Sequence, residues 1–216
     1  MHLDINHKRA QRVMAKFNLR PPRRRIPRYS TVSTSHHSYS NLLKDMIVST
    51  PHQVWCSDLS RLVYRDSVWY LATIEDRATR QILAARLGKR HDSQLVLATL
   101  RQALAAGRTP AIFHSDQGTE FMAQCCTDYL EQRGVRVSVS DVASPWQNGY
   151  IESFFGRFKQ ELGALDRFNS VGEMIEAIYR HIHYYNHRRI HTALRMPPAL
   201  YAAQAFSDTC LHKLGT

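Results

Sequence analysis

Three carboxylates in this sequence lie in surroundings suited to metal chemistry. Asp58 lies in Val-Trp-Cys-Ser-Asp-Leu-Ser, Asp116 in His-Ser-Asp-Gln-Gly-Thr-Glu-Phe, and Glu152 in Gln-Asn-Gly-Tyr-Ile-Glu-Ser-Phe-Phe. Hard divalent cations need several oxygen ligands, and phosphodiester chemistry also needs coordination positions left open for substrate phosphate. Acids that converge from separate elements therefore predict a metal site for phosphodiester chemistry, whereas three isolated acids would be ordinary surface charge.

The apolar pattern between residues 50 and 160 predicts the elements that would position these acids. Strands are expected at 54–59, 68–74, 81–87, 111–114 and 135–139, and helices at 92–106, at 119–133 and around residue 152. This order predicts an α/β fold with a mixed five-stranded sheet and helices on both faces. Asp58 and Asp116 meet at one end of that sheet if the first and fourth strands are neighbours, and the last of these helices supplies Glu152.

The composition is strongly basic. Among 216 residues, 29 Lys and Arg face 18 Asp and Glu, and the net charge of +11 favours a polyanionic partner, with nucleic acid as the leading candidate. No apolar run approaches the length of a membrane span, and the N-terminus lacks the apolar stretch of a signal peptide. We therefore expect no membrane partner and a cytoplasmic, nucleoid-associated protein. The four cysteines show neither a paired zinc spacing nor a disulfide framework, which predicts buried thiols and no zinc.

Changes in composition along the chain predict its domains. Residues 1–28 are expected to form a basic helix, near 5–19, and an arm, and residues 29–49 a polar linker. The core is expected at 50–205, with a C-terminal tail at 206–216. Arg23, Arg24 and Arg25 in the arm are candidate phosphate contacts, although a run of charge is also typical of a disordered tail.

Four separated motifs resemble those of a known family and occur in the same order. They are Trp55-x-x-Asp58, His114-Ser-Asp-Gln-Gly-Thr-Glu-Phe121, Asn148-Gly-x-x-Glu152-Ser-Phe-Phe-x-x-x-Lys159 and Tyr185-Asn-His-Arg-Arg-Ile-His191-x-x-Leu194-x-x-x-Pro198. Together they resemble the insertion sequence three family of bacterial transposases, whose catalytic core is shared with retroviral integrases. The match runs from about residue 54 to residue 201. Gln147-Asn148-Gly149 departs from the Asp-Asn-Ala of many members.

This resemblance implies a ribonuclease H-like fold and divalent-metal-dependent cleavage and transfer of DNA strands, as in transposition and DNA integration. Asp58, Asp116 and Glu152 match the family's acidic triad, so they are expected to be catalytic and to hold two Mg²⁺ or Mn²⁺ ions bridged by Asp58. The stretch at 6–25 resembles the end of a helix-turn-helix segment. The implied partners are transposon ends, target DNA, further copies of the chain, and a separate subunit that recognises the ends.

Two other functions are kept open. The chain is alternatively a DNA-binding relic of a transposase without catalysis, or a nuclease of the same fold that cuts RNA in a hybrid. Joining of an oligonucleotide end to DNA separates the expected activity from both alternatives.

Further candidate DNA contacts follow Glu152. Lys159 returns to nearly the same helix face after two turns, with Arg157 and Gln160 beside it, although a basic helix face is usually only solvated. Arg188 or Arg189 is expected to face DNA.

Several conspicuous side chains are expected to be structural. His114 ends a buried strand and is predicted to form hydrogen bonds there, with a metal role as the less favoured reading. Asn186 is predicted to be structural, and Phe154, Phe155 and Phe158 to fill the core. Trp146 is either part of a flap that orders on DNA or a hydrophobic plug, two readings left open.

Overall fold

The computed structural model describes residues 6–17, 19, 39–44, 46–141 and 149–205. The chain divides into two compact units, Met1–Val32 and Ser33–Thr216. The first contains helix α1 (His7–Lys16), which begins after Asn6, whose side chain accepts a hydrogen bond from the backbone N–H of Lys8. This confirms a helix in the basic segment. None of its residues is buried, so its apolar side chains do not form a core of their own.

The second unit is built on one mixed five-stranded sheet, as predicted. Its strands are β1 (Val54–Tyr64), β2 (Ser67–Asp76), β3 (Ile82–Gly88), β4 (Ile112–Ser115) and β5 (Arg136–Val139). Their order across the sheet is β3-β2-β1-β4-β5, in which β1 pairs antiparallel with β2 and parallel with β4. The first and fourth strands are therefore neighbours, which is the condition under which Asp58 and Asp116 were expected to meet.

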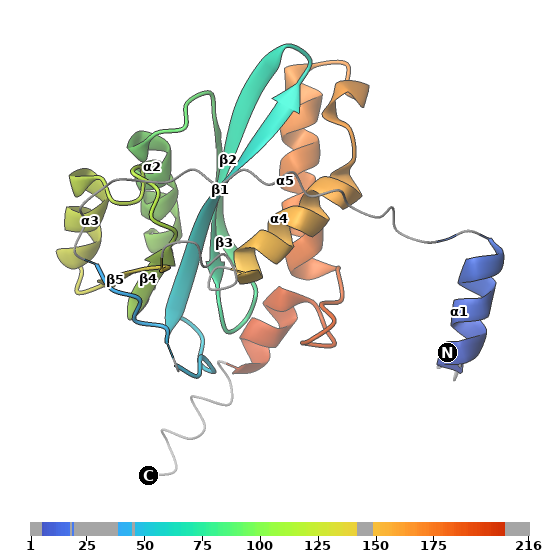
Figure 1. Ribbon diagram of the computed structural model, residues 1–216, viewed down its shortest axis with the longest axis horizontal. Helices are drawn as coiled ribbons and strands as arrows, with labels where there is room; N and C mark the ends of the chain where they lie inside the picture. Colours follow the sequence, from blue (N-terminus) through green and yellow to red (C-terminus); the bar gives the residue numbers. More distant parts are fainter. Residues whose placement is uncertain (1–5, 18, 20–38, 45, 142–148, 206–216) are drawn as a thin grey trace, which may run out of the picture. The chain divides into compact units, whose positions relative to one another are not determined.

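Helices cover both faces of this sheet. They are α2 (Ser93–Leu104), α3 (Gln124–Glu131), α4 (Gly149–Leu162), the short 3-10 helix η2 (Leu165–Arg167) and α5 (Val171–His187). Figure 1 shows α2 and α3 on one side of the strands, and α4 and α5 on the other. Among the described residues, no helix is long and apolar enough to cross a membrane.

Two predicted boundaries were wrong. β1 continues to Tyr64 instead of ending at residue 59, because Ser60, Leu62 and Tyr64 still alternate inward while the residues between them are exposed. α3 begins at Gln124 rather than at residue 119, because the backbone first turns back on Gly118, whose carbonyl accepts hydrogen bonds from the two residues before Ala123.

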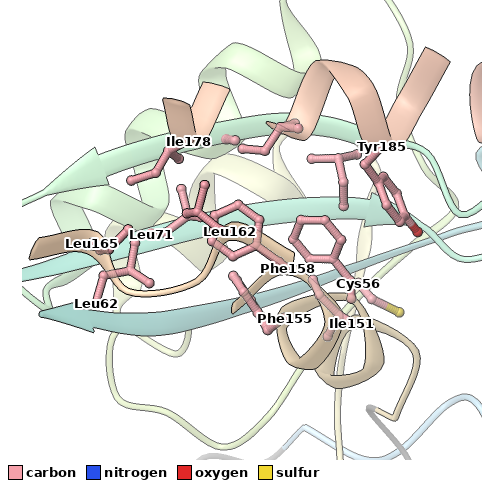
Figure 2. Packing of buried hydrophobic residues seen from close by; sticks show 14 of the residues in the cluster. Cys56, Leu62, Leu71, Ile151, Phe155, Phe158, Leu162, Leu165, Ile178 and Tyr185 are labelled. Carbon is pink, nitrogen blue, oxygen red and sulfur yellow. The ribbon is translucent and has the colours of Figure 1, made fainter. Parts of the chain in front are cut away.

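The face under α4 and α5 carries the larger of two hydrophobic clusters. Phe154, Phe155 and Phe158 project from α4 toward Leu71 and other apolar residues of the strands, as was expected of these aromatics. Figure 2 shows Phe155 and Phe158 in this layer between the strands and helices α4 and α5. Packing at this face fixes the orientation of α4, and with it the side of that helix that carries Glu152.

The opposite face holds a second cluster beneath α2 and α3. Trp55 is fully buried there, and the buried Cys126 lies in the same cluster. The expectation of buried thiols fails for Cys125, which is exposed because it lies on the outer side of α3. Cys210 lies outside the described residues.

Asn186 ties α5 to the start of β3. Its side chain accepts a hydrogen bond of 2.9 Å from the backbone N–H of Ile82 and donates one of 2.8 Å to the carbonyl of the same residue. These two hydrogen bonds give Asn186 the structural role that was expected of it. Because both backbone groups of Ile82 would be left unpaired and buried, Asn186→Ala is expected to lower the free energy of unfolding by about 1–3 kcal/mol, measured by urea denaturation.

The matched control for that change is Asn169, a second asparagine whose side chain has no such pairing with a strand among the described contacts. Equal stabilities of Asn186→Ala and Asn169→Ala would contradict the assignment of Asn186 as a tie between α5 and the sheet.

Candidate active site

The register of the parallel strands brings two of the three acids to one end of the sheet. Cys56 of β1 pairs with His114 of β4, so two residues farther along each strand the chain reaches Asp58 and Asp116. Asp58 follows Val54 and Cys56 on the sheet face that packs against α4. The expected meeting of these two acids is therefore built into the pairing of β1 with β4.

Glu152 comes from the first turn of α4, directly after the buried Ile151. Its side chain is exposed, as is that of Asp116, while Asp58 is only partly open to solvent. The three acids come from a strand, from the loop after another strand, and from a helix, as expected.

Electrostatics shows that the three carboxylates share one environment. Burial, together with the charges of Asp116 and Glu152, raises the pKa of Asp58 to about 8 against the opposing effects of the Leu59 backbone N–H and Lys159. Although Asp116 is accessible to solvent, the surrounding protein partly desolvates its carboxylate and raises its pKa, opposed by a hydrogen bond from the backbone N–H of Gly118. For Glu152, burial and the charge of Asp116 raise the pKa. Negative charge at this site is thus incompletely compensated by the protein.

The acids nevertheless do not form a closed cage. Within the part of the chain that the structure describes, no three His, Cys, Asp or Glu side chains are gathered closely enough to hold one metal ion. The donor set still fits a hard divalent cation, because it consists of carboxylate oxygens whose mutual repulsion a cation would relieve.

The loop after β4 is shaped by Asp116 itself. Its Oδ1 accepts a hydrogen bond of 3.0 Å from the backbone N–H of Gly118. A Cβ at Gly118 would lie 2.7 Å from Oε1 of Glu120 and 3.0 Å from Oδ1 of Asp116, so a larger residue there would displace these carboxylates. Among the described residues, no hydrogen bond to the other oxygen of Asp116 is found, which leaves that oxygen suited to a ligand.

His114 serves the structural role that was expected for it. It is fully buried, and its Nδ1 and Nε2 lie 2.9 Å and 3.1 Å from the hydroxyl oxygens of Ser138 and Ser140. Burial lowers its pKa to about 4. Because both ring nitrogens are engaged with β5 and the residue after it, His114 has no nitrogen left for a metal ion.

The expected DNA contacts differ in how available they are. Lys159 and Gln160 are exposed on α4, Arg157 is half-buried, and Arg188 is exposed just after α5. Arg189 is held by Glu161, with 2.8 Å between its Nη2 and Oε1. Arg23, Arg24, Arg25 and Trp146 lie outside the described residues, as does the tail at 206–216.

Sequence reasoning missed a cluster next to the first turn of α4. Tyr150 lies against the guanidinium groups of Arg77 and Arg80, which come from the turn between β2 and β3. The buried Glu75 precedes them. The signal in the sequence was the presence of two arginines, Arg77 and Arg80, among the five residues between β2 and β3, where a periodicity analysis interprets them as ordinary solvated charge.

Comparisons with known proteins agree with this geometry. Two family models, both described as integrase core domain, match residues 48–145 and 133–198. An uncharacterised transposase-like protein of Haemophilus influenzae is 30% identical over 209 residues, which make up 95% of this chain and 96% of that protein. The uncharacterised 31 kDa protein of insertion element IS600 from Shigella sonnei is 32% identical over 200 residues, covering 88% of this chain and 72% of that protein.

A solved structure shows the same fold. The catalytic core domain of HTLV-2 integrase in complex with magnesium, in its trimeric form, has a TM-score of 0.60 and 17% sequence identity. The similarity covers 71% of this chain and 97% of that chain. This likeness confirms the predicted ribonuclease H-like fold.

Proposed function

Because the chain belongs to the insertion sequence three family of transposases with an integrase catalytic core, we propose that it cleaves and joins DNA strands with an Asp-Asp-Glu triad and divalent metal. The family places it among the polynucleotidyl transferases of DNA transposition. Asp58, Asp116 and Glu152 are the residues proposed to carry the reaction. The observation that supports them most directly is the raised pKa of Asp58, to which burial contributes first and then the charges of the other two acids.

In this proposal the carboxylates of Asp58, Asp116 and Glu152 would hold two Mg²⁺ or Mn²⁺ ions. The ions, when bound, supply Lewis acidity to the phosphodiester and to the attacking hydroxyl. The protein holds the acids on β1, on the loop after β4 and on α4, and the buried layer beneath α4 excludes water from one side of the site. Magnesium in the HTLV-2 integrase core agrees with this choice of metal.

The partners proposed are transposon ends, target DNA and further copies of the chain, acting in the bacterial cytoplasm and nucleoid. The trimeric form of the HTLV-2 core is consistent with an assembly of several copies. A separate subunit for end recognition, and the division into a basic arm at 1–28, a linker at 29–49, a core at 50–205 and a tail at 206–216, also belong to this proposal. Arg23, Arg24, Arg25, Arg157, Gln160, Arg188 and Arg189 are its remaining candidate DNA contacts.

The experiment that tests the function measures strand joining. Purified protein, a labelled duplex that carries the element's end sequence, and a plasmid target are incubated with Mg²⁺, Mn²⁺ or EDTA. We expect joined products with either metal and none with EDTA. DNA binding without joining would indicate the inactive relic, and cleavage confined to the RNA of a hybrid would indicate the nuclease.

Lys159 is proposed to contact the DNA backbone next to the acids. Its charge lowers the pKa of Asp58, so the ammonium group lies close enough to the acid site for a phosphate held there to reach it. Lys159→Glu is expected to weaken DNA binding about tenfold and to reduce the slope of log K against log salt by about 1. Fluorescence anisotropy at several salt concentrations in Ca²⁺ measures both quantities.

Lys44→Glu is a matched charge reversal for this test. Lys44 is exposed and pairs with Asp141 at 2.9 Å, apart from the proposed α4 contacts. A salt slope that is the same for Lys159→Glu and the parent protein would refute the phosphate contact.

A further inference from the structure

The turn between β2 and β3 is a rigid platform close to the start of α4. The carboxylate of Asp76 accepts hydrogen bonds from the backbone N–H groups of His52, Ala78 and Thr79, at 2.6, 3.0 and 2.9 Å. The backbone N–H of Arg77 donates to the carbonyl of Val54 at 2.9 Å, which fastens the turn to β1. The turn is therefore held from within and by the strand that carries Asp58.

Two guanidinium groups project from this platform onto one ring of α4. The Cζ of Arg80 lies 3.5 Å from the centroid of the Tyr150 ring, and that of Arg77 lies 4.8 Å from it. Such stacking is attractive because the face of an aromatic ring carries negative charge density. Tyr150 precedes Glu152 by two residues in the first turn of α4. The contact thus links the sheet to the part of α4 that carries the third acid.

The backbone of Arg80 is unusual for an arginine. Its φ is +62°, a conformation in which glycine or asparagine is ordinarily preferred. Such a backbone conformation persists where the surrounding structure determines it. Replacement of Arg80 by glycine would therefore remove the side chain without adding backbone strain.

A buried acid of β2 lies within electrostatic range of the two arginines. Glu75 is 1% exposed and pairs across the sheet with Cys56, one residue pair away from the pair of Ser57 with Ile74 and two from the pair of Asp58 with Thr73. The charges of Arg80 and Arg77 act on Glu75 and oppose the effect of its burial. The two arginines therefore lie within electrostatic range of a buried acid of β2 and stack on the ring of α4.

From this geometry we propose that Arg80, together with Arg77, is a positioning residue for Glu152: by holding Tyr150 against the sheet, it sets the approach of the first turn of α4 to Asp58. This inference rests on the proposed function, because it assumes that Glu152 is a metal ligand. It assigns a role in the reaction to a hairpin turn that contributes none of the three acids.

The test compares variants of the full chain in Mn²⁺ binding, followed by the electron paramagnetic resonance of free Mn²⁺. Arg80→Gly suits this test because glycine favours the backbone at that position, so the side chain is removed without strain. Tyr150→Leu removes the ring from the other side, and Tyr150→Phe keeps it. Arg195→Gly is the matched control, because Arg195 is exposed and has the same kind of backbone, with φ +58°.

Arg80→Gly and Tyr150→Leu are each expected to weaken Mn²⁺ binding about tenfold, as loss of a residue that orients a metal ligand commonly does. Tyr150→Phe and Arg195→Gly are expected to bind Mn²⁺ as the parent does, and all four are expected to melt near the parental temperature. Amide hydrogen exchange at 149–155 should become faster in Arg80→Gly and Tyr150→Leu alone. A purely stabilising role would instead lower the melting temperature and leave the Mn²⁺ affinity of the folded protein unchanged.

Glu152→Gln separates failure of this inference from failure of the proposed function. If the parent and Glu152→Gln bind Mn²⁺ equally, the proposed metal site is wrong and the positioning role falls with it. If Glu152→Gln is weakened while Arg80→Gly binds as the parent does, the metal site stands and the positioning role of Arg80 is overturned.

Discussion

Asp58→Asn is expected to reduce strand transfer by about 10³-fold or more, because it removes a carboxylate proposed to hold the metal ions and so several kcal/mol of transition-state stabilisation. Asparagine has nearly the same volume, so the packing of β1 against α4 should be kept. The measurement is the initial rate of joining of a labelled DNA end to a plasmid in Mg²⁺.

Two controls make this result specific. Asp66→Asn changes an exposed aspartate in the turn after the same strand and should leave the rate unchanged. DNA binding in Ca²⁺ should be similar for Asp58→Asn and the parent. A folded Asp58→Asn protein that joins strands at the parental rate would remove Asp58 from the proposed mechanism.

The sheet could be predicted because its signals are local. Apolar runs in β2, β3, β4 and β5 are bounded by turn residues, and these strands were found close to their expected bounds. The prediction ended β1 at residue 59 because its second half contains Arg61 among apolar residues, and an assignment from continuous apolar runs ends there. Pairing with β2 along the whole strand, which no local pattern reveals, supplies the missing reason for its length.

The start of α3 could not be predicted for a related reason. Residues after Thr119 have an acceptable helical pattern, but Asp116 draws the backbone N–H of Gly118 toward its own carboxylate. The chain therefore turns before the helix can begin. The side chain of Asp116, which is proposed to be catalytic, has here displaced the local helical preference.

The acid site was predicted in part. The motifs supplied its three residues, and the neighbouring positions of β1 and β4 supplied the reason why Asp58 and Asp116 lie together. The contact of Tyr150 with Arg77 and Arg80 was not predicted, because it joins residues about seventy positions apart through a stacking geometry that leaves no periodic trace. Residue identity thus indicated the chemistry, whereas the support for that chemistry became visible only in three dimensions.

The raised pKa of Asp58 connects the site to the stability of the fold. Burial and the neighbouring acids favour the protonated form of Asp58 in the folded protein, whereas the pKa of Asp58 in the unfolded chain is near 3.8. A bound cation would reverse this preference, because it pairs with the ionised form. The ionised carboxylate of Asp58 therefore destabilises the metal-free fold, and the same carboxylate would bind the metal.

This connection predicts how the metal-free protein responds to pH. The folded-state pKa of Asp58 is about 8 against 3.8 in the unfolded chain, so its contribution to stability is full below pH 4 and is lost as pH rises toward 8. His114 acts oppositely, because its pKa is lowered from 6.5 to about 4 and stability gained from it is complete only above 6.5. The effect of Asp58 is therefore clearest between pH 6.5 and 8.

In that interval the metal-free parent is expected to lose stability relative to Asp58→Asn by up to about 2 kcal/mol, since one proton corresponds to about 1.4 kcal/mol for each pH unit. Glu75, whose pKa burial also raises to about 8, affects both proteins alike and cancels in the difference. Urea denaturation in EDTA at several pH values measures this difference.

Added Mg²⁺ should then stabilise the parent and leave Asp58→Asn nearly unchanged, because only the parent retains the carboxylate that the cation would neutralise. Parallel pH profiles for the two proteins in EDTA would show that Asp58 is ionised without penalty, and that the acids of this site do not share the uncompensated charge on which metal binding is proposed to depend.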